Sequence, residues 1–139
     1  MVSALSVDSF TQNIAGTYKV PNTKSTLIIE EVPNSKKLTA TIKRVTIQNG
    51  GSIKKINLKG RYKLVEQGNH GEKFYLITLQ GMGKWEDSSG NKFPIAFTLS
   101  GFITKDNPEN MTSQFAAAYE FKGNAEDVIG GVLGWKKKP

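Results

Sequence analysis

Apolar and polar side chains alternate at every second position along much of this chain, most clearly in residues 56–64. There the even positions hold apolar residues or glycine, and the odd positions hold polar residues. Because successive side chains of a β-strand point to opposite faces, this pattern predicts a strand with one face on a core and the other in water. A helix would scatter the same apolar residues around its surface. The alternation therefore favours β-sheet.

The same pattern predicts several strands, separated by turns rich in proline, asparagine and glycine. We expect strands at about residues 14–20, 25–32, 38–47, 53–65, 73–80, 92–104, 111–121 and 128–135. Short connections favour antiparallel pairing of consecutive strands, and a closed sheet leaves no exposed edge. The sequence thus predicts an all-β fold, an eight-stranded antiparallel up-and-down β-barrel. Pro94 predicts a bulge or a late start in the sixth strand, and residues 81–86 could extend the fifth.

The length of 139 residues fits a single domain over residues 1–139, with residues 1–12 as a candidate flexible arm. The chain has no cysteine, which excludes disulfides. No apolar run is long enough for a membrane helix. The first residues do not resemble a signal peptide, so we expect a cytoplasmic protein or a mature secreted form. Asn110 begins a glycosylation triplet, whose use the sequence leaves open.

Catalytic and metal-binding patterns are scarce. His70 is the one histidine, and with no cysteine this excludes the common zinc sites. Glu30 and Glu31 are neighbours on a predicted strand, so their side chains point to opposite faces and cannot act as a pair. No nucleophile elbow or phosphate-binding loop is present. We therefore expect a protein that is not an enzyme, with no metal site.

The inward face of the sixth and seventh strands decides whether the barrel has room for a ligand. If Phe97 and Phe115 point inward, the lumen is aromatic and nearly dry. If Ala116 and Ala118 point inward instead, their small side chains leave space for a small molecule. The alternation alone does not choose between these two arrangements.

A formal charge of +7 comes almost entirely from lysine. Basic residues concentrate on the third and fourth predicted strands, and the candidate surface patch consists of Lys43, Arg44, Lys59, Arg61 and Lys63. Such a patch attracts anionic partners such as glycans, lipid head groups or nucleic acid. Nucleic acid is disfavoured, because arginine forks are scarce and Tyr62 points away from the patch.

The order of the predicted strands resembles the avidin family of biotin-binding barrels. That family opens with Gly-Thr-aromatic, continues with Ser-Thr before an apolar strand, and has Leu-x-Gly-Arg-Tyr in its fourth strand. The matching segments here are residues 16–18, 25–29, 38–42, 58–62, 99–101 and 111–115. Lipocalins and fatty-acid-binding proteins share the general design, but their other signatures are less evident.

The resemblance implies a non-enzymatic protein that holds a small molecule in the barrel and forms dimers or tetramers through its outer sheet faces. The ligand-binding residues it implies are Ser25, Ile42, Trp85, Phe97, Leu99 and Phe115. Ser25 matches the serine that binds the ureido group of biotin, whereas Ile42 stands where that family has a tyrosine. Since the other polar contacts fall near Ile95 and Phe97, we expect a mostly apolar ligand other than biotin, and no cofactor.

A second hypothesis belongs to a different class of protein. In it, the barrel is a filled scaffold and the basic patch is the working surface of an interaction or toxin-like protein. A lumen binder would ignore salt, whereas binding of an anionic partner to the patch would weaken steeply as salt rises.

Overall fold

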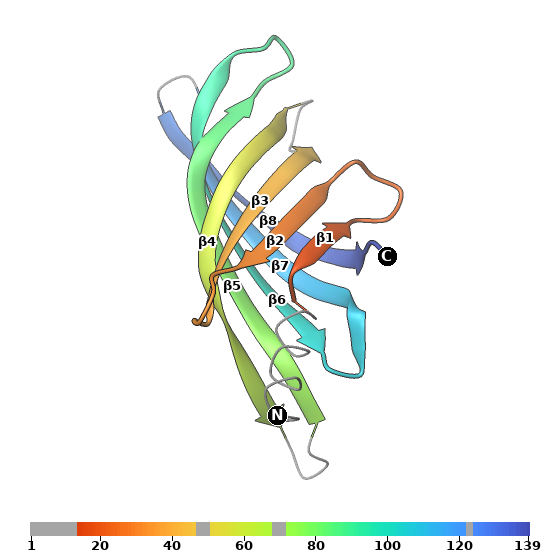
Figure 1. Cartoon of the computed structure of the whole chain (residues 1–139). Helices are drawn as coiled ribbons and strands as arrows, with labels where there is room; N and C mark the ends of the chain where they lie inside the picture. Colours follow the sequence, from red (N-terminus) through yellow and green to blue (C-terminus); the bar gives the residue numbers. More distant parts are fainter. Residues whose placement is uncertain (1–13, 47–50, 68–71, 122–123) are drawn as a thin grey trace.

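The structure is a computed structural model that describes residues 14–46, 51–67, 72–121 and 124–139. These residues form an antiparallel barrel, seen from the side in Figure 1. The strands are β1 (Gly16–Lys19), β2 (Thr26–Glu31), β3 (Lys37–Thr46), β4 (Ser52–Gln67), β5 (Glu72–Glu86), β6 (Lys92–Thr104), β7 (Asn107–Phe121) and β8 (Asn124–Lys137).

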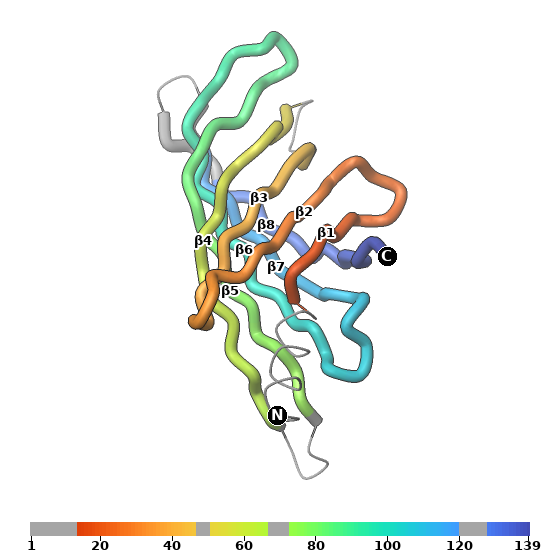
Figure 2. Tube along the Cα trace, viewed as in Figure 1, coloured from red at the N-terminus to blue at the C-terminus, as the bar shows by residue number. Residues whose placement is uncertain are grey.

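Each strand pairs with the next in sequence order, and β8 pairs with β1 to close the barrel. The closing ladder is short, because it consists of the pairs Tyr18–Lys137 and Lys19–Lys136. Figure 2 shows the C-terminus beside β1, where this closure occurs. The predicted fold class, an eight-stranded antiparallel up-and-down barrel, is confirmed.

The interior is filled by large apolar side chains, which alternate with outward-facing residues along each strand. Phe97 is buried and Phe115 is half-buried on the inner face, and their rings stack with centroids 5.7 Å apart. Ala116 and Ala118 face outward and are exposed. Of the two arrangements that the sequence allowed, the structure has the aromatic lumen.

Three strands are longer than the alternation predicts by four residues or more. β8 runs over Asn124–Lys137, where residues 128–135 were expected. β5 continues through the glycine-containing segment to Glu86, and β7 begins at Asn107.

The bulge or late start predicted at Pro94 is wrong, because β6 begins at Lys92 and Pro94 pairs with Lys84 in a continuous register with β5. Proline is tolerated there because, in the described pairing, the ladder with β7 begins only at Ile95, so Pro94 is paired on one side.

Gly60 shows why β4 and β5 can approach closely. A Cβ atom on Gly60 would overlap the backbone carbonyl of Thr78 on β5. Only glycine lacks a Cβ, so this position accepts no other residue without a backbone shift. Further along, the pairing of β4 with β5 shifts register between Lys59 and Ser52.

Two features of the sequence analysis fall outside the described residues: His70 and the candidate arm at residues 1–12. Within the described residues, no helix has the length and apolar character needed to cross a membrane. The same part of the chain contains no cluster of acidic or histidine side chains that could hold a metal ion.

Candidate ligand site at the mouth of the barrel

Two cavities of similar size indent the barrel. One, of about 740 Å³, lies where the turn between β1 and β2 meets the end of β3 and the start of β4. Figure 1 shows these three segments at the same end of the barrel, which we call the mouth; the opposite end is the base. The other cavity, of about 760 Å³, is a groove across the outer wall over β2 to β6.

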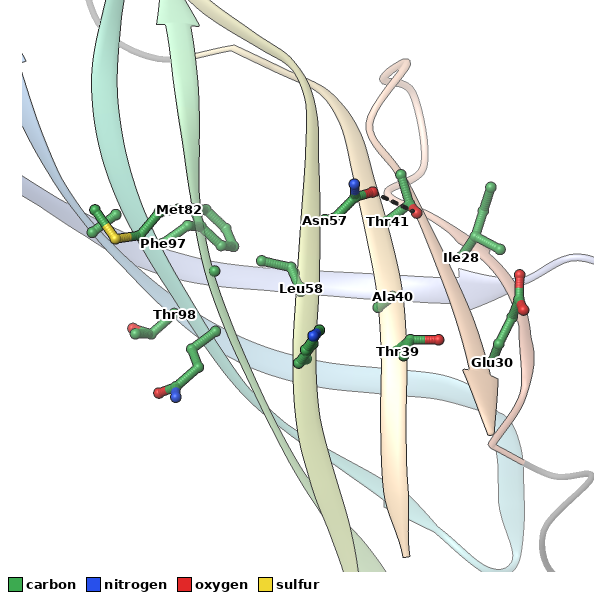
Figure 3. Close-up of a pocket in the computed structure, with 14 residues that line it drawn as sticks. Ile28, Glu30, Thr39, Ala40, Thr41, Asn57, Leu58, Met82, Phe97 and Thr98 are labelled. Carbon is green, nitrogen blue, oxygen red and sulfur yellow. Dashed lines mark hydrogen bonds between the residues drawn. The ribbon is translucent and has the colours of Figure 1, made fainter. Parts of the chain in front are cut away.

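The outer groove is lined mainly by the exposed face of the wall, as Figure 3 shows. Thr41 donates a hydrogen bond to Asn57 along its side, with 3.4 Å between Oγ1 and Oδ1. Leu58 and Phe97 form part of its floor. Its polar side chains are spread over a solvent-facing wall, so the groove offers no enclosed polar anchor.

The mouth pocket has an apolar floor and a polar rim. Its floor is formed by Val20, Val45, Ile53, Phe115 and Leu133. Hydroxyl groups and cationic residues surround this floor: Thr23, Ser25, Thr46 and Ser52, with Lys24, Arg44 and Lys54. Such a combination of an apolar surface with a few polar groups is typical of sites for small molecules.

A chain of hydrogen bonds fixes the turn between β1 and β2. Asn22 has a positive φ of 65°, which asparagine tolerates better than most residues. Thr23 donates from Oγ1 to the carbonyl of Val20 over 2.8 Å, and the same oxygen accepts from the backbone N–H of Ser25 over 3.1 Å. One wall of the pocket is therefore shaped without a ligand.

Ser25 ties this turn to β3. Its hydroxyl donates to the carbonyl oxygen of Arg44 over 3.0 Å. Arg44 has a φ of 60°, a left-handed conformation that is uncommon for a long side chain inside a strand. The hydroxyl proton of Ser25 is thus engaged with the protein itself, while its oxygen lone pairs can still accept a hydrogen bond.

The positive φ of Arg44 changes which residues of β3 face inward. Ala40 and Ile42 are buried at alternate positions, so a regular strand would point Arg44 inward as well. Instead Arg44 is exposed and Val45 is buried. This switch places an apolar side chain in the pocket floor and keeps the arginine at the rim.

An ion pair stands beside the pocket. Lys54 Nζ lies 3.3 Å from Glu86 Oε2, which joins the start of β4 to the end of β5. The side chain of Lys54 is 74% exposed, so solvent screens the pair and its contribution to stability is small.

The base of the barrel holds a different set of polar groups. Burial raises the pKa of Tyr75 to about 12, with further contributions from Tyr62 and Glu31. Burial also raises the pKa of Tyr18, Tyr62 and Glu31, and it lowers the pKa of Lys137. One carboxylate oxygen of Glu31 is buried without a hydrogen-bond partner. Lys137 Nζ lies 5.7 Å from the ring centre of Tyr18.

The six predicted ligand-binding residues divide into two groups. Ser25 and Phe115 line the mouth pocket. Ile42, Phe97 and Leu99 are buried in the packed interior. Trp85 is also buried, with its ring against those of Phe93 and Tyr119 at centroid distances of 5.2 and 5.3 Å.

The predicted basic patch is also divided. Lys59, Arg61 and Lys63 are exposed on the outer face of β4, and Lys43 is half-buried on β3. Arg44 instead lines the mouth pocket. Arg44, which was predicted to belong to the basic surface patch, is thus part of the candidate ligand site.

Sequence reasoning missed four floor residues of the mouth pocket, which are Val20, Val45, Ile53 and Leu133. A weak signal was available for β3, because the apolar residues Ile42 and Val45 are three positions apart and break the two-residue period. Ile53 and Ile56 show the same break on β4, opposite β3. Because these breaks lie at paired positions, the inward-facing residues of both strands shift by one position at the same place.

The fold is similar to solved structures of biotin-binding proteins. Xenavidin matches with a TM-score of 0.56 and 16% identity, over 91% of this chain and 98% of that chain. A biotin-binding protein from chicken matches with a TM-score of 0.52 and 10% identity, over 92% of this chain and 99% of that chain. No protein-family model matches the sequence, and a comparison with curated proteins finds no match. From the closed topology and these two structures together, the chain has an avidin-like β-barrel fold.

Proposed function

We propose that this protein is a non-enzymatic binding protein, whose mouth pocket holds a small and mostly apolar molecule. The observation that carries the proposal is the pocket of about 740 Å³, with an apolar floor and a hydroxyl-bearing rim. The stacked rings of Phe97 and Phe115 fill the lumen, so the mouth is the end at which a ligand has room. The two biotin-binding structures with the same fold support a binding role.

We infer from the barrel interior that the ligand is not biotin. Ile42, Ile95 and Phe97 are buried where the family resemblance expects polar contacts, and their side chains cannot hydrogen-bond. Each buried polar atom of a ureido group left without a partner costs about 1–3 kcal/mol. Because about 1.4 kcal/mol corresponds to tenfold in affinity, three such losses remove several orders of magnitude.

A neutral fluorescent probe tests the binding site. We expect N-phenyl-1-naphthylamine to bind saturably, since its rings match an apolar floor. Thr46→Trp at the exposed rim of the pocket should weaken this binding, because the new ring occupies the mouth. Thr39→Trp is the matched control, since Thr39 is exposed on the outer wall and lines the other groove.

Three outcomes would overturn the proposal. They are the absence of saturable binding, equal affinity in wild type and Thr46→Trp, and a loss confined to Thr39→Trp. Calorimetry with biotin addresses ligand identity separately, and a nanomolar dissociation constant would contradict the account of the lost polar contacts.

We also propose that the chain forms a homo-oligomer through the outer face of β7 and β8. Val128 and Val132 are 76% and 67% exposed on β8, opposite Ala118 and Gln114 on β7. Of the described residues, none of those facing outward between 112 and 118 or between 128 and 134 is charged. An uncharged, flat surface with exposed valines is typical of a contact between subunits.

Native mass spectrometry of wild type and Val132→Lys tests this contact. Wild type should be a dimer or tetramer, and the variant should dissociate because a lysine would be buried in the interface. A monomeric wild type, or an oligomer that Val132→Lys leaves intact, would contradict the proposed surface.

The basic wall of β3 and β4 supports a second candidate function, binding of an anionic partner. Lys37 lies directly opposite Arg61, and Lys43 lies opposite Lys55. Like charges on opposite strands destabilise a sheet, so an external anion would offset a cost already present. Binding to immobilised heparin should then fall steeply with salt and weaken in Arg61→Gln; salt-independent retention would exclude this candidate.

A further inference from the structure

Positive charge surrounds the apolar floor of the mouth pocket. Lys24, Arg44 and Lys54 line it, and none of its described lining residues is acidic. Lys54 forms an ion pair with Glu86. Lys24 and Arg44 have no ion-pair partner among the described residues.

The apolar floor and the charged rim act on different parts of a ligand. The floor binds an apolar body without distinguishing its charge. Lys24, Arg44 and Lys54 are exposed to solvent, so their attraction for an anionic group is moderate and depends on salt. An anionic group at this rim is therefore favoured over a neutral group, and a cationic group is disfavoured.

The backbone conformation of Arg44 places this residue at the rim of the pocket. Its left-handed φ of 60° takes the residue out of the inward alternation of β3, and the hydroxyl of Ser25 holds its carbonyl at 3.0 Å. Non-glycine residues in this conformation carry strain and are found more often at sites that hold a ligand. The strain keeps a permanently charged guanidinium at the rim, where a regular strand would bury it.

We propose that the mouth selects molecules with an apolar body and one anionic group, such as a carboxylate or sulfonate, and that Arg44 determines this preference. The inference rests on the proposed function, because it requires that the mouth be a ligand site. It adds the charge of the ligand and the residue that recognises it.

Two probes with the same aromatic body provide the test. 8-Anilinonaphthalene-1-sulfonate carries a sulfonate, whereas N-phenyl-1-naphthylamine is its neutral counterpart. At low salt we expect wild type to bind the anionic probe about tenfold more tightly, the ratio that one charge-assisted hydrogen bond supplies. High salt should reduce this ratio, because ions screen the charge at the rim.

Arg44→Gln removes the charge and should lower the ratio of the two affinities to about one, since the remaining contacts are shared by both probes. Lys24→Gln should lower the ratio in the same direction by a smaller factor, and it serves if Arg44→Gln does not fold. Lys84→Gln is the matched control, because it removes an exposed positive charge that lines neither cavity. It should leave the ratio unchanged.

The outcomes separate the two proposals. If neither probe binds wild type, the proposed function fails and the inference fails with it. If both probes bind with equal affinity and salt has no effect, the mouth remains a ligand site but the charge preference is wrong. If Lys84→Gln lowers the ratio as much as Arg44→Gln, the preference reflects the net charge of the protein, and the role of Arg44 is refuted.

Discussion

The base of the barrel is filled with large side chains, whereas the mouth keeps a cavity of about 740 Å³. In the packed interior, Trp135 and Tyr75 are almost completely buried, and Trp135 Nε1 donates to the hydroxyl of Ser113 over 2.9 Å. At the mouth, one hydrogen bond from Ser25 to Arg44 joins neighbouring strands around an apolar floor. The polar groups of the base are held by burial, while those of the mouth face a space that a ligand can enter.

From this difference we expect the packed part of the barrel to stabilise the fold and the mouth to bind the ligand. Substitutions in the packed part should change the free energy of unfolding, and substitutions at the mouth should mainly change binding.

Trp135→Ala should have the largest effect. It removes a fully buried ring and leaves Ser113 without one of its partners, so we expect a loss of about 3–5 kcal/mol in the free energy of unfolding. Met82→Ala, at a position of β5 that is 78% exposed, should change it by less than about 0.5 kcal/mol. Urea denaturation measures both, and equal effects would show that the packed interior is not the main source of stability.

Gly60→Ala should destabilise by about 2–3 kcal/mol, because its Cβ would overlap the carbonyl of Thr78 and force β4 and β5 apart. Gly134→Ala is the matched control, since a Cβ there meets no atom within 4 Å. Thermal unfolding of the two variants compares them directly. A wild-type melting temperature for Gly60→Ala would contradict the close approach of the strands.

The buried tyrosines predict a loss of stability at high pH. In the folded protein the pKa of Tyr75 is raised to about 12, so above pH 10 the unfolded chain releases this proton while the folded chain retains it. Stability should therefore fall between pH 10 and 12, by about 1.4 kcal/mol per pH unit for this group. Denaturation at several pH values should show a shallower fall for Tyr75→Phe, and an unchanged slope would contradict the burial of the hydroxyl.

Ser25→Ala should have the smallest effect on stability, about 1 kcal/mol, because it removes one hydrogen bond near the surface. It should have a larger effect on ligand selection, since the backbone of Arg44 loses its restraint. Titration with the anionic and neutral probes measures this. If Ser25→Ala destabilises the protein as much as Trp135→Ala and leaves the ratio of the two probe affinities unchanged, the mouth is a stabilising element and not a site of ligand selection.

The fold was predictable because its signal is local. Much of the chain shows the two-residue period, as residues 56–64 do, and this period identifies strands even where, as on β7, it does not show which face is buried. The extension of the fifth strand was left open for a physical reason, since Gly81 and Gly83 have no side chains to show the alternation that carries β5 to Glu86. Glycines on β8 hid the burial of Trp135 in the same way.

The site was less predictable, because it depends on contacts between distant segments. Ser25 and Phe115 were identified through the family resemblance, and both line the pocket. The position of Arg44 depends on a positive φ and on a hydrogen bond to a residue 19 positions earlier, which no short pattern reveals. The pocket floor combines parts of β3, β4, β7 and β8, and only the closed barrel brings these together.

Amide-resolved NMR during titration with the neutral probe tests the central claim, that the mouth is the binding end of this barrel. The account predicts chemical-shift changes centred on Val20, Val45 and Leu133, with small changes at Tyr62 and Tyr75 in the base. Changes centred on Met82 and Thr98 in the outer groove of Figure 3, with an unperturbed mouth, would contradict it.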